Sequence, residues 1–592
     1  MTSQLFYKTL NKSKLLAVGS LFLFLLLLII DIVFNKEMLY GDAGYYLLQI
    51  INDQKFAIEH QRPISIVIEF LPLILTYFHT SIDLIIISFA LNQWLYYFIC
   101  FLIVAFVFND IRSAAGIIFS LIFGSQLNYF NPVSELILST PLFFIFLHLL
   151  KKTNSFAYIL NFFLSLLIIY NHPLNTLFLI FLIAFDHIFN KKSFSKKNAI
   201  FYIYILLSST VHYFLLDSYE KNPQIELNVN QYTPLEGLMH FDFIDLISRT
   251  LISYSGTALL LFITCYLFIK EKKIPLLVML LCFVFSYTFL VLFKFSFLYP
   301  NEPFERYMYP IPLLLCISFF HFSTSDFSNA KKNLHKIIIS LIFLAAFYQY
   351  YKLIDHGLFV KSRYEQLDRA IQYAQQFNEP KIAFRKENYY VCPKGHDWIM
   401  SSESLLLSSE FGSQLTRQIL IIGAVSPEKI SSLPKSYFFY APWWSKSIQE
   451  LNKNYFSMTE NEFRYANTDS IQSGYTEFFF NNINVNIGGS SNYKTNREYL
   501  IPITVYNKNT IPLTSGRGKE AVYLSYHWLR GNEVIQWEGM RSPIMADVFS
   551  NLNQEIIVKM PEQKGIYSLH AAIVYEGKRW CEINSTKQII IE

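Results

Sequence analysis

A carboxylate flanked by aromatic residues stands just beyond the first apolar segment of the chain. In the stretch MLYGDAGYYLLQI (residues 38–50), Asp42 precedes Tyr45 and Tyr46. A carboxylate facing lipid at this point would be costly, whereas one facing water could take a proton from a reacting hydroxyl group. If a helix begins here, its period places Gln49 on the same face as these three residues. We therefore predict that Asp42 faces water and acts as a catalytic base or orients the acceptor. The two tyrosines are predicted to line the substrate site or to anchor the helix at the membrane interface.

Further polar side chains stand in loops that the topology described below assigns to the same side. They are Asp53, His60 and Arg62 in the first loop, Asn131 and Glu135, Asn171 and His172, and Glu302, Glu305, Arg306 and Tyr307. Such a set suits group transfer from a phosphate-linked donor, because a carboxylate can take the proton of an acceptor hydroxyl while Arg and His hold the phosphate leaving group. Glu135 is predicted to be a second catalytic acid, and His60, Arg62, His172, Arg306 and Tyr307 are predicted to bind substrate. The alternative is that these are ordinary residues of a membrane interface.

The composition indicates a membrane protein. Of the 592 residues, 53% are hydrophobic and 16% are charged, and the mean hydropathy is +0.30. Soluble globular proteins carry about 25% charged residues. The sequence contains no Walker motif, no G-x-S-x-G, no H-E-x-x-H and no zinc-ligand spacing. The net charge of +5 is weak evidence for any partner, and we expect no nucleic-acid partner.

Apolar runs of about spanning length predict eleven transmembrane helices. They cover roughly residues 15–34, 83–108, 113–130, 133–150, 155–171, 173–189, 199–217, 249–270, 274–298, 307–323 and 335–354. Basic residues lie before the first run and in alternate short loops, as in Lys151 and Lys152. With eleven crossings all these loops are cytoplasmic, as the positive-inside rule requires. The N-terminus is then cytoplasmic, and the residues after about 355 are extracytoplasmic.

One apolar stretch, RPISIVIEFLPLILTYF (residues 62–78), is left over. It carries Glu69 and two prolines, and counting it as a twelfth span would reverse the sides of the following loops. We interpret it as a juxtamembrane or re-entrant helix on the outer side, with an ordinary span as the alternative.

Three domains follow from this pattern. Residues 1–354 form the transmembrane domain. Residues 355–470 mix a helical stretch (SRYEQLDRAIQYAQQF) with short strands (QILIIGAV, SYFFYAPWW) and predict a small α/β domain, while residues 471–592 alternate apolar and polar residues as a β-sandwich does. Cys392 and Cys581 could pair if these domains lie in an oxidising compartment, and the sequence leaves this open.

The order of these features resembles the GT-C superfamily of membrane glycosyltransferases, and within it the protein O-mannosyltransferase and aminoarabinose transferase branch. Members carry an acid soon after the first span, on a juxtamembrane helix, in an Asp-Glu/Asp-x-x-Tyr setting. YGDAGYYLLQI is similar to that motif, with Asp42 as the matching acid. The sequence departs from the pattern at Ala43, where many members have a second acid, so metal binding by this loop does not follow. The resemblance covers about residues 10–354.

Further stretches extend the resemblance. HQRPISIVIEFLPLILTYF resembles the second juxtamembrane helix of these enzymes, and NPVSELILSTPLFFIF resembles the turn at which they place another acid, which matches Glu135. His172 stands where several members have a phosphate-contacting lysine. ERYMYPIPLLL resembles their Arg-Tyr-x-x-Pro start of a late helix, which matches Arg306 and Tyr307.

The C-terminal sequence resembles an immunoglobulin-like module found beside bacterial glycosyltransferase domains. The matching residues are Tyr526, Trp528, Gly565, Tyr567, Leu569 and Trp580. We interpret the aromatic residues as the core of the sandwich, with a glycan-binding face as the alternative.

Together these features predict a polytopic α-helical enzyme of the bacterial cytoplasmic membrane. The resemblance implies a glycosyltransferase that uses a polyprenyl-phosphate-linked sugar, inverts the anomeric carbon and glycosylates a glycan, lipid or protein on the periplasmic face. No cofactor is certain, and a divalent metal stays an alternative. Two rival functions are a lipid-linked glycan transporter, which would favour an internal repeat and polar residues near mid-membrane, and a non-catalytic membrane anchor for a glycan-binding domain.

Overall fold

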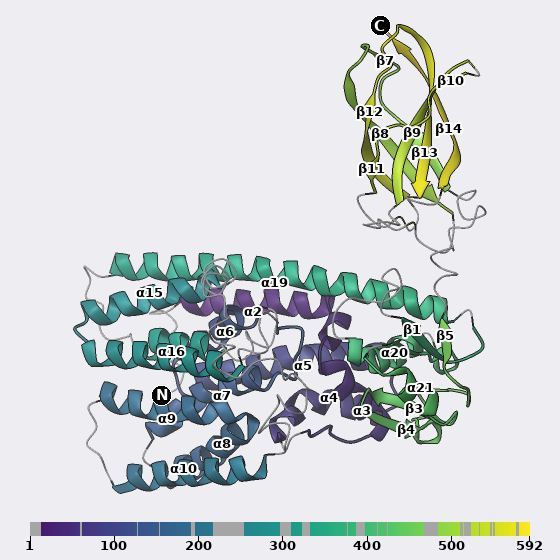
Figure 1. The fold of residues 1–592 in the computed structure, drawn as a ribbon. Coiled ribbons are helices and arrows are strands. Elements are labelled where there is room, and N and C mark those ends of the chain that lie inside the picture. Colours follow the sequence, from purple (N-terminus) through teal and green to yellow (C-terminus); the bar gives the residue numbers. More distant parts are fainter. Residues whose placement is uncertain are drawn as a thin grey trace. The chain divides into compact units, whose positions relative to one another are not determined.

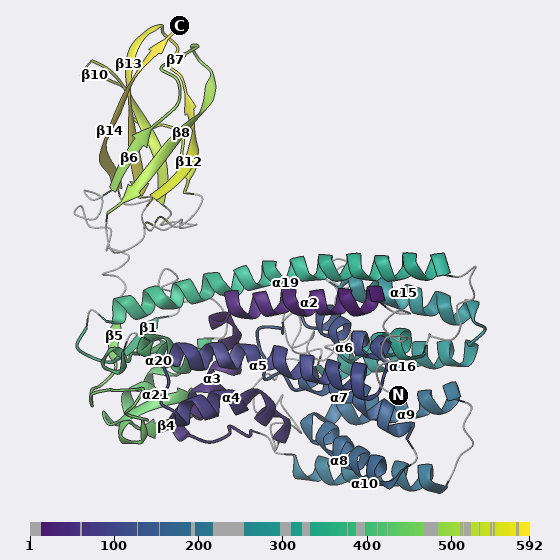
Figure 2. The ribbon, with the colours of Figure 1, turned by 180° about the vertical axis from the view of Figure 1, so that it is seen from behind.

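The computed structural model describes the chain in two compact units (Figures 1 and 2). The first comprises Met1–Ile382, Pro393–Leu420 and Ala424–Phe463, and the second comprises Ala383–Cys392, Ile421–Gly423 and Arg464–Glu592. The described residues are 14–59, 62–126, 128–152, 154–190, 196–216, 254–295, 309–322, 332–375, 377–385, 397–410, 412–422, 424–466, 483–508, 513, 522–531, 533–544, 548, 551–575 and 579–592.

The first unit is mostly helical. Its apolar helices are α2 (Lys14–Val33), α3 (Ala43–Asp53), α4 (Ile66–Tyr77), α5 (Ile82–Leu102), α6 (Ile111–Gly124), α7 (Glu135–Leu150), α8 (Ser155–Asn171), α9 (Pro173–Asn190), α10 (Lys196–Leu215), α15 (Ser255–Lys270), α16 (Ile274–Phe295), α18 (Pro310–Cys316) and α19 (Lys332–Ala374). The π-helical turns η3 (Ile103–Val107) and η5 (Ile317–Phe322) continue α5 and α18. The short 3-10 helices η1 (Lys36–Leu39) and η2 (Pro63–Ser65) precede α3 and α4.

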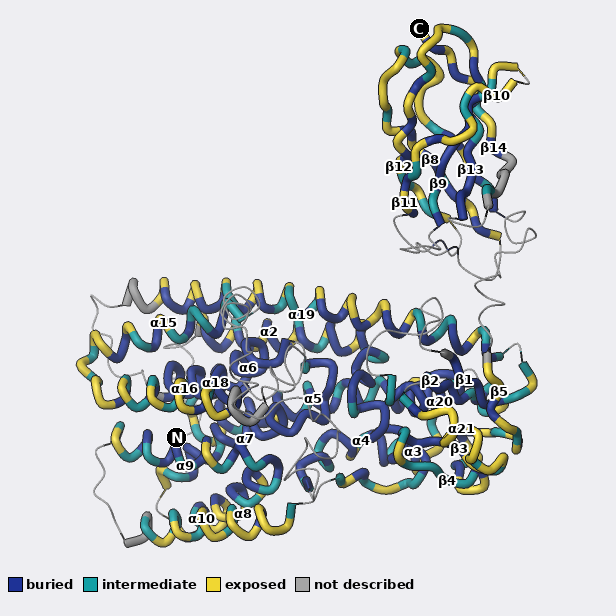
Figure 3. The backbone as a smooth tube through the Cα atoms, viewed as in Figure 1, coloured by how far each residue is buried: buried dark blue, intermediate teal, exposed yellow. Residues whose placement is uncertain are grey.

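The outer faces of these helices are apolar. On α2, Leu21, Leu25 and Ile29 are about half exposed, while Phe24 and Leu27 are buried. Exposed and buried residues also alternate along α10 and α19 (Figure 3). Because soluble proteins rarely expose large contiguous apolar surfaces, this pattern is typical of helices that face lipid.

Among the residues that the structure describes, five helices are long and apolar enough to cross a membrane. They are Leu15–Val33, Ile82–Val107, Pro173–Asn190, Ile274–Val291 and Lys336–Ala374, and seven further apolar helices have 10–17 residues. The count of eleven spans therefore stays a prediction. α4, which covers the leftover stretch, has 12 residues, or about 18 Å at 1.5 Å per residue, which is less than a hydrocarbon core of about 30 Å.

The longest helix, α19, has 43 residues. At 1.5 Å per residue it is about 65 Å long, roughly twice the thickness of a hydrocarbon core. The helical stretch expected at the start of the α/β domain is thus the continuation of the last apolar helix, and the expected boundary after residue 354 falls inside α19. α2 lies alongside α19 in both views (Figures 1 and 2).

The part of the chain after α19 mixes helices and short strands, as predicted. A three-stranded sheet has the order β2-β1-β5, built from β1 (Lys381–Arg385), β2 (Gln418–Ile422) and β5 (Arg464–Ala466). β3 (Tyr437–Ala441) and β4 (Trp444–Ser447) form an antiparallel hairpin. The helices here are α20 (Met400–Ser409) and α21 (Pro427–Ser432).

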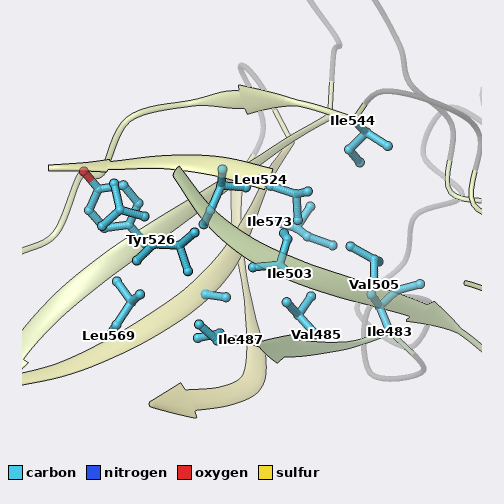
Figure 4. Packing of buried hydrophobic residues seen from close by; sticks show 14 of the residues in the cluster. Ile483, Val485, Ile487, Ile503, Val505, Leu524, Tyr526, Ile544, Leu569 and Ile573 are labelled. Atoms are coloured by element: carbon cyan, nitrogen blue, oxygen red, sulfur yellow. The ribbon is translucent and has the colours of Figure 1, made fainter. Parts of the chain in front are cut away.

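The C-terminal residues form a β-sandwich. One sheet has the order β12-β8-β6, and the other has the order β10-β9-β13-β14-β7 with β11 paired to β9. The strands are β6 (Ile483–Ile487), β7 (Asn492–Tyr493), β8 (Glu498–Asn507), β9 (Val522–Arg530), β10 (Glu533–Gln536), β11 (Ser542–Pro543), β12 (Asn551–Lys559), β13 (Gly565–Tyr575) and β14 (Arg579–Ile591). Alternate residues of both sheets, such as Ile503 on β8 and Leu524 on β9, fill the core between them (Figure 4).

The aromatic residues of the immunoglobulin-like pattern divide between core and surface. Tyr526, Trp528 and Tyr567 are buried in the core. The Tyr526 hydroxyl accepts a hydrogen bond from the backbone N–H of Lys559 at 2.9 Å, and the Trp528 indole donates to its carbonyl at 2.9 Å, so their polar ends are satisfied, as buried aromatics require. Trp580 is half-buried and lies outside this core cluster.

The topology can be tested with reporter fusions. A reporter at Lys196, where α10 begins, is expected on the cytoplasmic side, because Lys196 and Lys197 belong to a basic loop. A reporter at Lys429, in α21 beyond α19, is expected on the opposite side. Accessibility of both reporters to a membrane-impermeant reagent decides the question, and the same side for both would exclude the predicted topology.

Candidate functional site

A helix begins after Gly41, as the sequence predicts. Gly41 has φ +70°, which favours glycine, and a Cβ there would lie 3.0 Å from the side-chain nitrogen of Asn131. The turn before the helix therefore packs closely on the turn that precedes α7. Asp42 occupies the N-cap position of α3, but its side chain makes no capping hydrogen bond. The carboxylate thus lies at the positive end of the helix dipole without being committed to the cap.

Charged groups gather around Tyr46. Its side chain is buried, with 9% exposure. Burial raises the pKa of the Tyr46 phenol, and the positive charge of Arg62 acts in the opposite direction. The negative charges of Glu135, Asp42 and Glu59 raise the pKa further. One cation and three carboxylates therefore lie near enough to this tyrosine to act on its ionisation.

The cation and one of these carboxylates form a buried ion pair. Arg62 Nη1 donates to Glu135 Oε1. The two side chains are only 10% and 7% exposed. Arg62 directly precedes the short helix η2, and Glu135 is the first residue of α7. The pair therefore ties the loop between α3 and α4 to the start of α7.

The residues around His172 extend the site to the end of α8. The side chain of Asn171 donates to the backbone carbonyl of Glu135 and to the hydroxyl of Ser139. The next residue, His172, is buried, and its Nδ1 accepts a hydrogen bond from the backbone N–H of Leu174 at 3.1 Å. Nε2 is then the nitrogen of His172 that carries the hydrogen in the neutral ring.

The carboxylate of Glu59 binds two other residues of α3, Tyr45 and Gln49. Glu59 Oε1 accepts hydrogen bonds from Gln49 Nε2 at 2.9 Å and from the Tyr45 hydroxyl at 3.4 Å. Burial raises the pKa of Tyr45, and the charge of Glu59 adds to this. Glu59 therefore acts on both tyrosines of the motif.

The far end of α3 is held by the residues of the β3–β4 hairpin. Lys446 Nζ lies 2.8 and 2.9 Å from the two carboxylate oxygens of Asp53, and the Tyr440 hydroxyl donates to Asp53 at 3.2 Å. Burial raises the pKa of Asp53, but the hydrogen bonds from Lys446 and Asn52 lower it more, so the carboxyl stays ionised. Asp53 therefore positions α3 rather than reacting.

Tryptophans from the same part of the chain lie beside Tyr45. The ring centroids of Trp443 and Trp444 are 6.4 and 6.2 Å from that of Tyr45, and Trp398 lies 5.2 Å from Trp443. Trp443 is 62% exposed. This places an accessible aromatic surface next to the polar residues of α3.

The structure brings together part of the predicted site. Arg62 and Glu135 form an ion pair, and the charges of Asp42, Arg62 and Glu135 all act on the pKa of Tyr46. Tyr45 is hydrogen-bonded to Glu59. The predicted residues His60, Arg306 and Tyr307 lie outside the described residues, as do Glu302 and Glu305.

Sequence reasoning missed Glu59, although the acid stands directly before His60 in a loop already assigned to the outer face. It also did not pair Arg62 with Glu135, which are 73 residues apart. Glu59 could have been found from the sequence, because it is an acidic residue in the same predicted loop as Asp42. No spacing rule would have indicated the long-range pair.

The arrangement combines two possible proton acceptors, Asp42 and Glu59, with the cation Arg62, which is held by Glu135. Such a set suits removal of a proton next to a phosphate. Within the described part of the chain, the three His and Asp side chains close enough to hold a metal ion are Asp110, His148 and His321, at the other end of α7. The carboxylates near Tyr46 are thus not part of that group.

Comparison with known proteins adds little. No family model and no curated protein matches the chain. Among solved structures, a solution structure of a CARDB domain from Pyrococcus furiosus is similar to part of this chain. The match covers 19% of this chain and 94% of that domain, with 15% sequence identity and a TM-score of 0.13. At that TM-score the similarity carries no argument, so function has to be argued from the site.

Proposed function

We propose that the chain is an integral membrane glycosyltransferase that transfers a sugar from a polyprenyl-phosphate donor to an acceptor on the extracytoplasmic face. The observation that carries the proposal is the grouping of Asp42 with the Arg62–Glu135 pair around Tyr46, at the first loop after an apolar helix. A proton acceptor and a phosphate-binding cation are the two groups that this transfer requires.

The proposed step assigns one role to each charged group. Asp42 takes the proton of the acceptor hydroxyl, whose oxygen forms a bond to the anomeric carbon of the sugar. The bond from that carbon to the phosphate oxygen breaks, and its electron pair leaves with the polyprenyl phosphate. Arg62 stabilises the negative charge that develops on the phosphate, since its guanidinium stays charged and offers five donors.

Glu135 takes a different role from the one expected from sequence. Because it is buried against Arg62, its carboxylate is proposed to hold the guanidinium in place rather than to act as the base. Glu59, which lies near both tyrosines, is the second carboxylate that could accept a proton.

The exposed tryptophan supports a carbohydrate substrate. The exposed ring of Trp443 lies 6.4 Å from the ring of Tyr45, which directly precedes Tyr46. The apolar C–H face of a sugar packs well on an aromatic ring, and Trp offers the largest such surface. We propose that this surface contacts the acceptor.

Glycan analysis of a deletion strain tests the proposal in the cell. Loss of one cell-envelope glycan, restored by the wild-type gene but not by Asp42→Asn, is the expected result. Restoration by Asp42→Asn, together with failure of a variant truncated after Phe463, would instead favour the non-catalytic anchor. Accumulation of the unaltered lipid-linked glycan on the cytoplasmic leaflet would favour the transporter.

His172 and Arg306 yield a prediction about the phosphate. His172→Lys is expected to keep more donor turnover than His172→Ala, because a lysine ammonium can donate to a phosphate as the Nε2–H of His172 can, and lysine is the residue that the resembling enzymes use. Arg306→Ala is expected to weaken donor use severely, and Arg306→Lys to rescue it in part, because a lysine lacks the forked donors of arginine. Donor turnover of the purified variants is the measurement. Full activity of Arg306→Ala would remove Arg306 from the site.

A further inference from the structure

A second cluster of polar side chains lies at the other end of α7. His148 is in the last turn of this helix, 13 residues after Glu135, which is about 20 Å along the axis at 1.5 Å per residue. Asp110 directly precedes α6, and His321 lies in η5. One ring nitrogen of each histidine and one Asp110 oxygen lie within 4.8 Å of one another. The cluster is therefore separate from the site around Tyr46.

His148 is oriented as a ligand. Its Nδ1 lies 2.7 Å from the backbone carbonyl oxygen of Phe144. Because a carbonyl oxygen only accepts, Nδ1 donates, and Nε2 faces Asp110 Oδ2 at 3.1 Å. With Nδ1 held in this way, Nε2 is the ring nitrogen of His148 that faces the cluster and offers a ligand atom. Metal-binding histidines commonly donate their other ring N–H to a carbonyl in this way.

The other two side chains are also held by neighbouring groups. The Ser113 hydroxyl lies 2.7 Å from His321 Nδ1 and 2.8 Å from Asp110 Oδ2. Asp110 Oδ1 accepts hydrogen bonds from the backbone N–H groups of Arg112 and Ser113, both at 3.1 Å, and so caps α6. These contacts fix both candidate ligands before any ion binds.

A cation already occupies one edge of the cluster. The Lys151 ammonium lies 2.6 Å from His321 Nε2. Lys151 is exposed and Asp110 is partly exposed, whereas His148 and His321 are buried.

We propose that Asp110, His148 and His321 bind a divalent transition-metal ion, with Zn²⁺ as the ion that fits best. Two imidazoles and one carboxylate suit Zn²⁺, whereas Mg²⁺ and Ca²⁺ prefer oxygen ligands. Lys151 moves aside when the ion enters. The ligands come from three separate elements, so the ion would hold the start of α6, the end of α7 and η5 together. Its role would therefore be structural.

Metal content of the purified full-length protein tests the site. After treatment with a chelator and incubation with Zn²⁺ alone, the wild type is expected to retain about one ion per chain through desalting, as measured by elemental mass spectrometry. His148→Ala and His321→Ala should lose it. His79→Ala, which changes an exposed histidine of another loop, should retain it. Wild-type protein that retains no more Zn²⁺ than His148→Ala would overturn the proposal.

Two further variants separate loss of the ion from misfolding and test whether Lys151 competes with the ion. Asp110→Asn keeps a side-chain acceptor for the α6 cap, since Asn is as good an N-cap as Asp, and it should fold while losing the ion. Lys151→Ala removes the competing ammonium and should bind Zn²⁺ at least several-fold more tightly. Full Zn²⁺ retention by Asp110→Asn, or unchanged affinity in Lys151→Ala, would contradict the assignment. No sugar donor is used, so the outcome is independent of the proposed transferase activity.

Discussion

Asp42→Asn is expected to lower sugar transfer about 10²–10⁴-fold, which is the usual contribution of a positioned general base. The amide that replaces the carboxylate cannot take the acceptor proton. Folding should be preserved, because the Asp42 side chain makes no capping hydrogen bond to α3 and Asn is tolerated as well as Asp at an N-cap position. The measurement is turnover of the purified variant at saturating donor.

Asp83→Asn is the matched control for this substitution. Asp83 lies in the first turn of α5 and is exposed, so the same loss of charge there should leave turnover unchanged. Near-normal turnover of Asp42→Asn would remove Asp42 from the mechanism. In that case Glu59→Gln, which changes the other carboxylate near the tyrosines, becomes the next variant to measure.

The buried Arg62–Glu135 pair provides the second large effect. Removing one member leaves the other charge buried and uncompensated, which typically costs about 3–5 kcal/mol. Arg62→Met and Glu135→Gln are each expected to lower the free energy of unfolding by an amount of this order. The double variant should lose less than the sum of the two, because neither charge is then left alone.

Activity separates the role of the pair in stability from its role in catalysis. If Arg62 binds the phosphate, the double variant should regain stability relative to the single variants but remain without donor turnover. Glu462→Gln is the control, because Glu462 pairs with Lys435 at 3.1 Å on the surface, where both side chains are more than 60% exposed and such pairs contribute little. Additive losses of stability would contradict the pairing, and an active double variant would contradict the phosphate assignment.

The local features of the site could be predicted from sequence. The helix after Gly41 follows from the glycine and the apolar period of α3, and the β-sandwich follows from the alternation of strands such as β8. Both depend on interactions between residues that are close in sequence, which the order of residue types encodes directly.

Contacts between distant segments could not be predicted in the same way. The pairing of Arg62 with Glu135 and the grouping of Asp110, His148 and His321 arise only when separate helices pack together. The length of α19 was also not evident from the sequence, because its apolar part ends near residue 354. The polar remainder continues the same helix to Ala374, since it contains no proline and its one glycine, Gly357, does not end the helix. Hydropathy therefore indicated where the apolar stretch ends, and not where the helix ends.

Release of polyprenyl phosphate is the direct product of the proposed sugar transfer. Purified wild-type protein, incubated with a panel of polyprenyl-phosphate-linked sugars and a mixed glycan and lipid acceptor extract, is expected to convert at least one donor to free polyprenyl phosphate with the sugar appearing on an acceptor, as followed by mass spectrometry. Asp42→Asn should lower the rate of this release by about 10²–10⁴-fold, and Asp83→Asn should leave it unchanged. Equal release by the wild type and by Asp42→Asn, or sugar release without any glycosylated acceptor, would contradict the account.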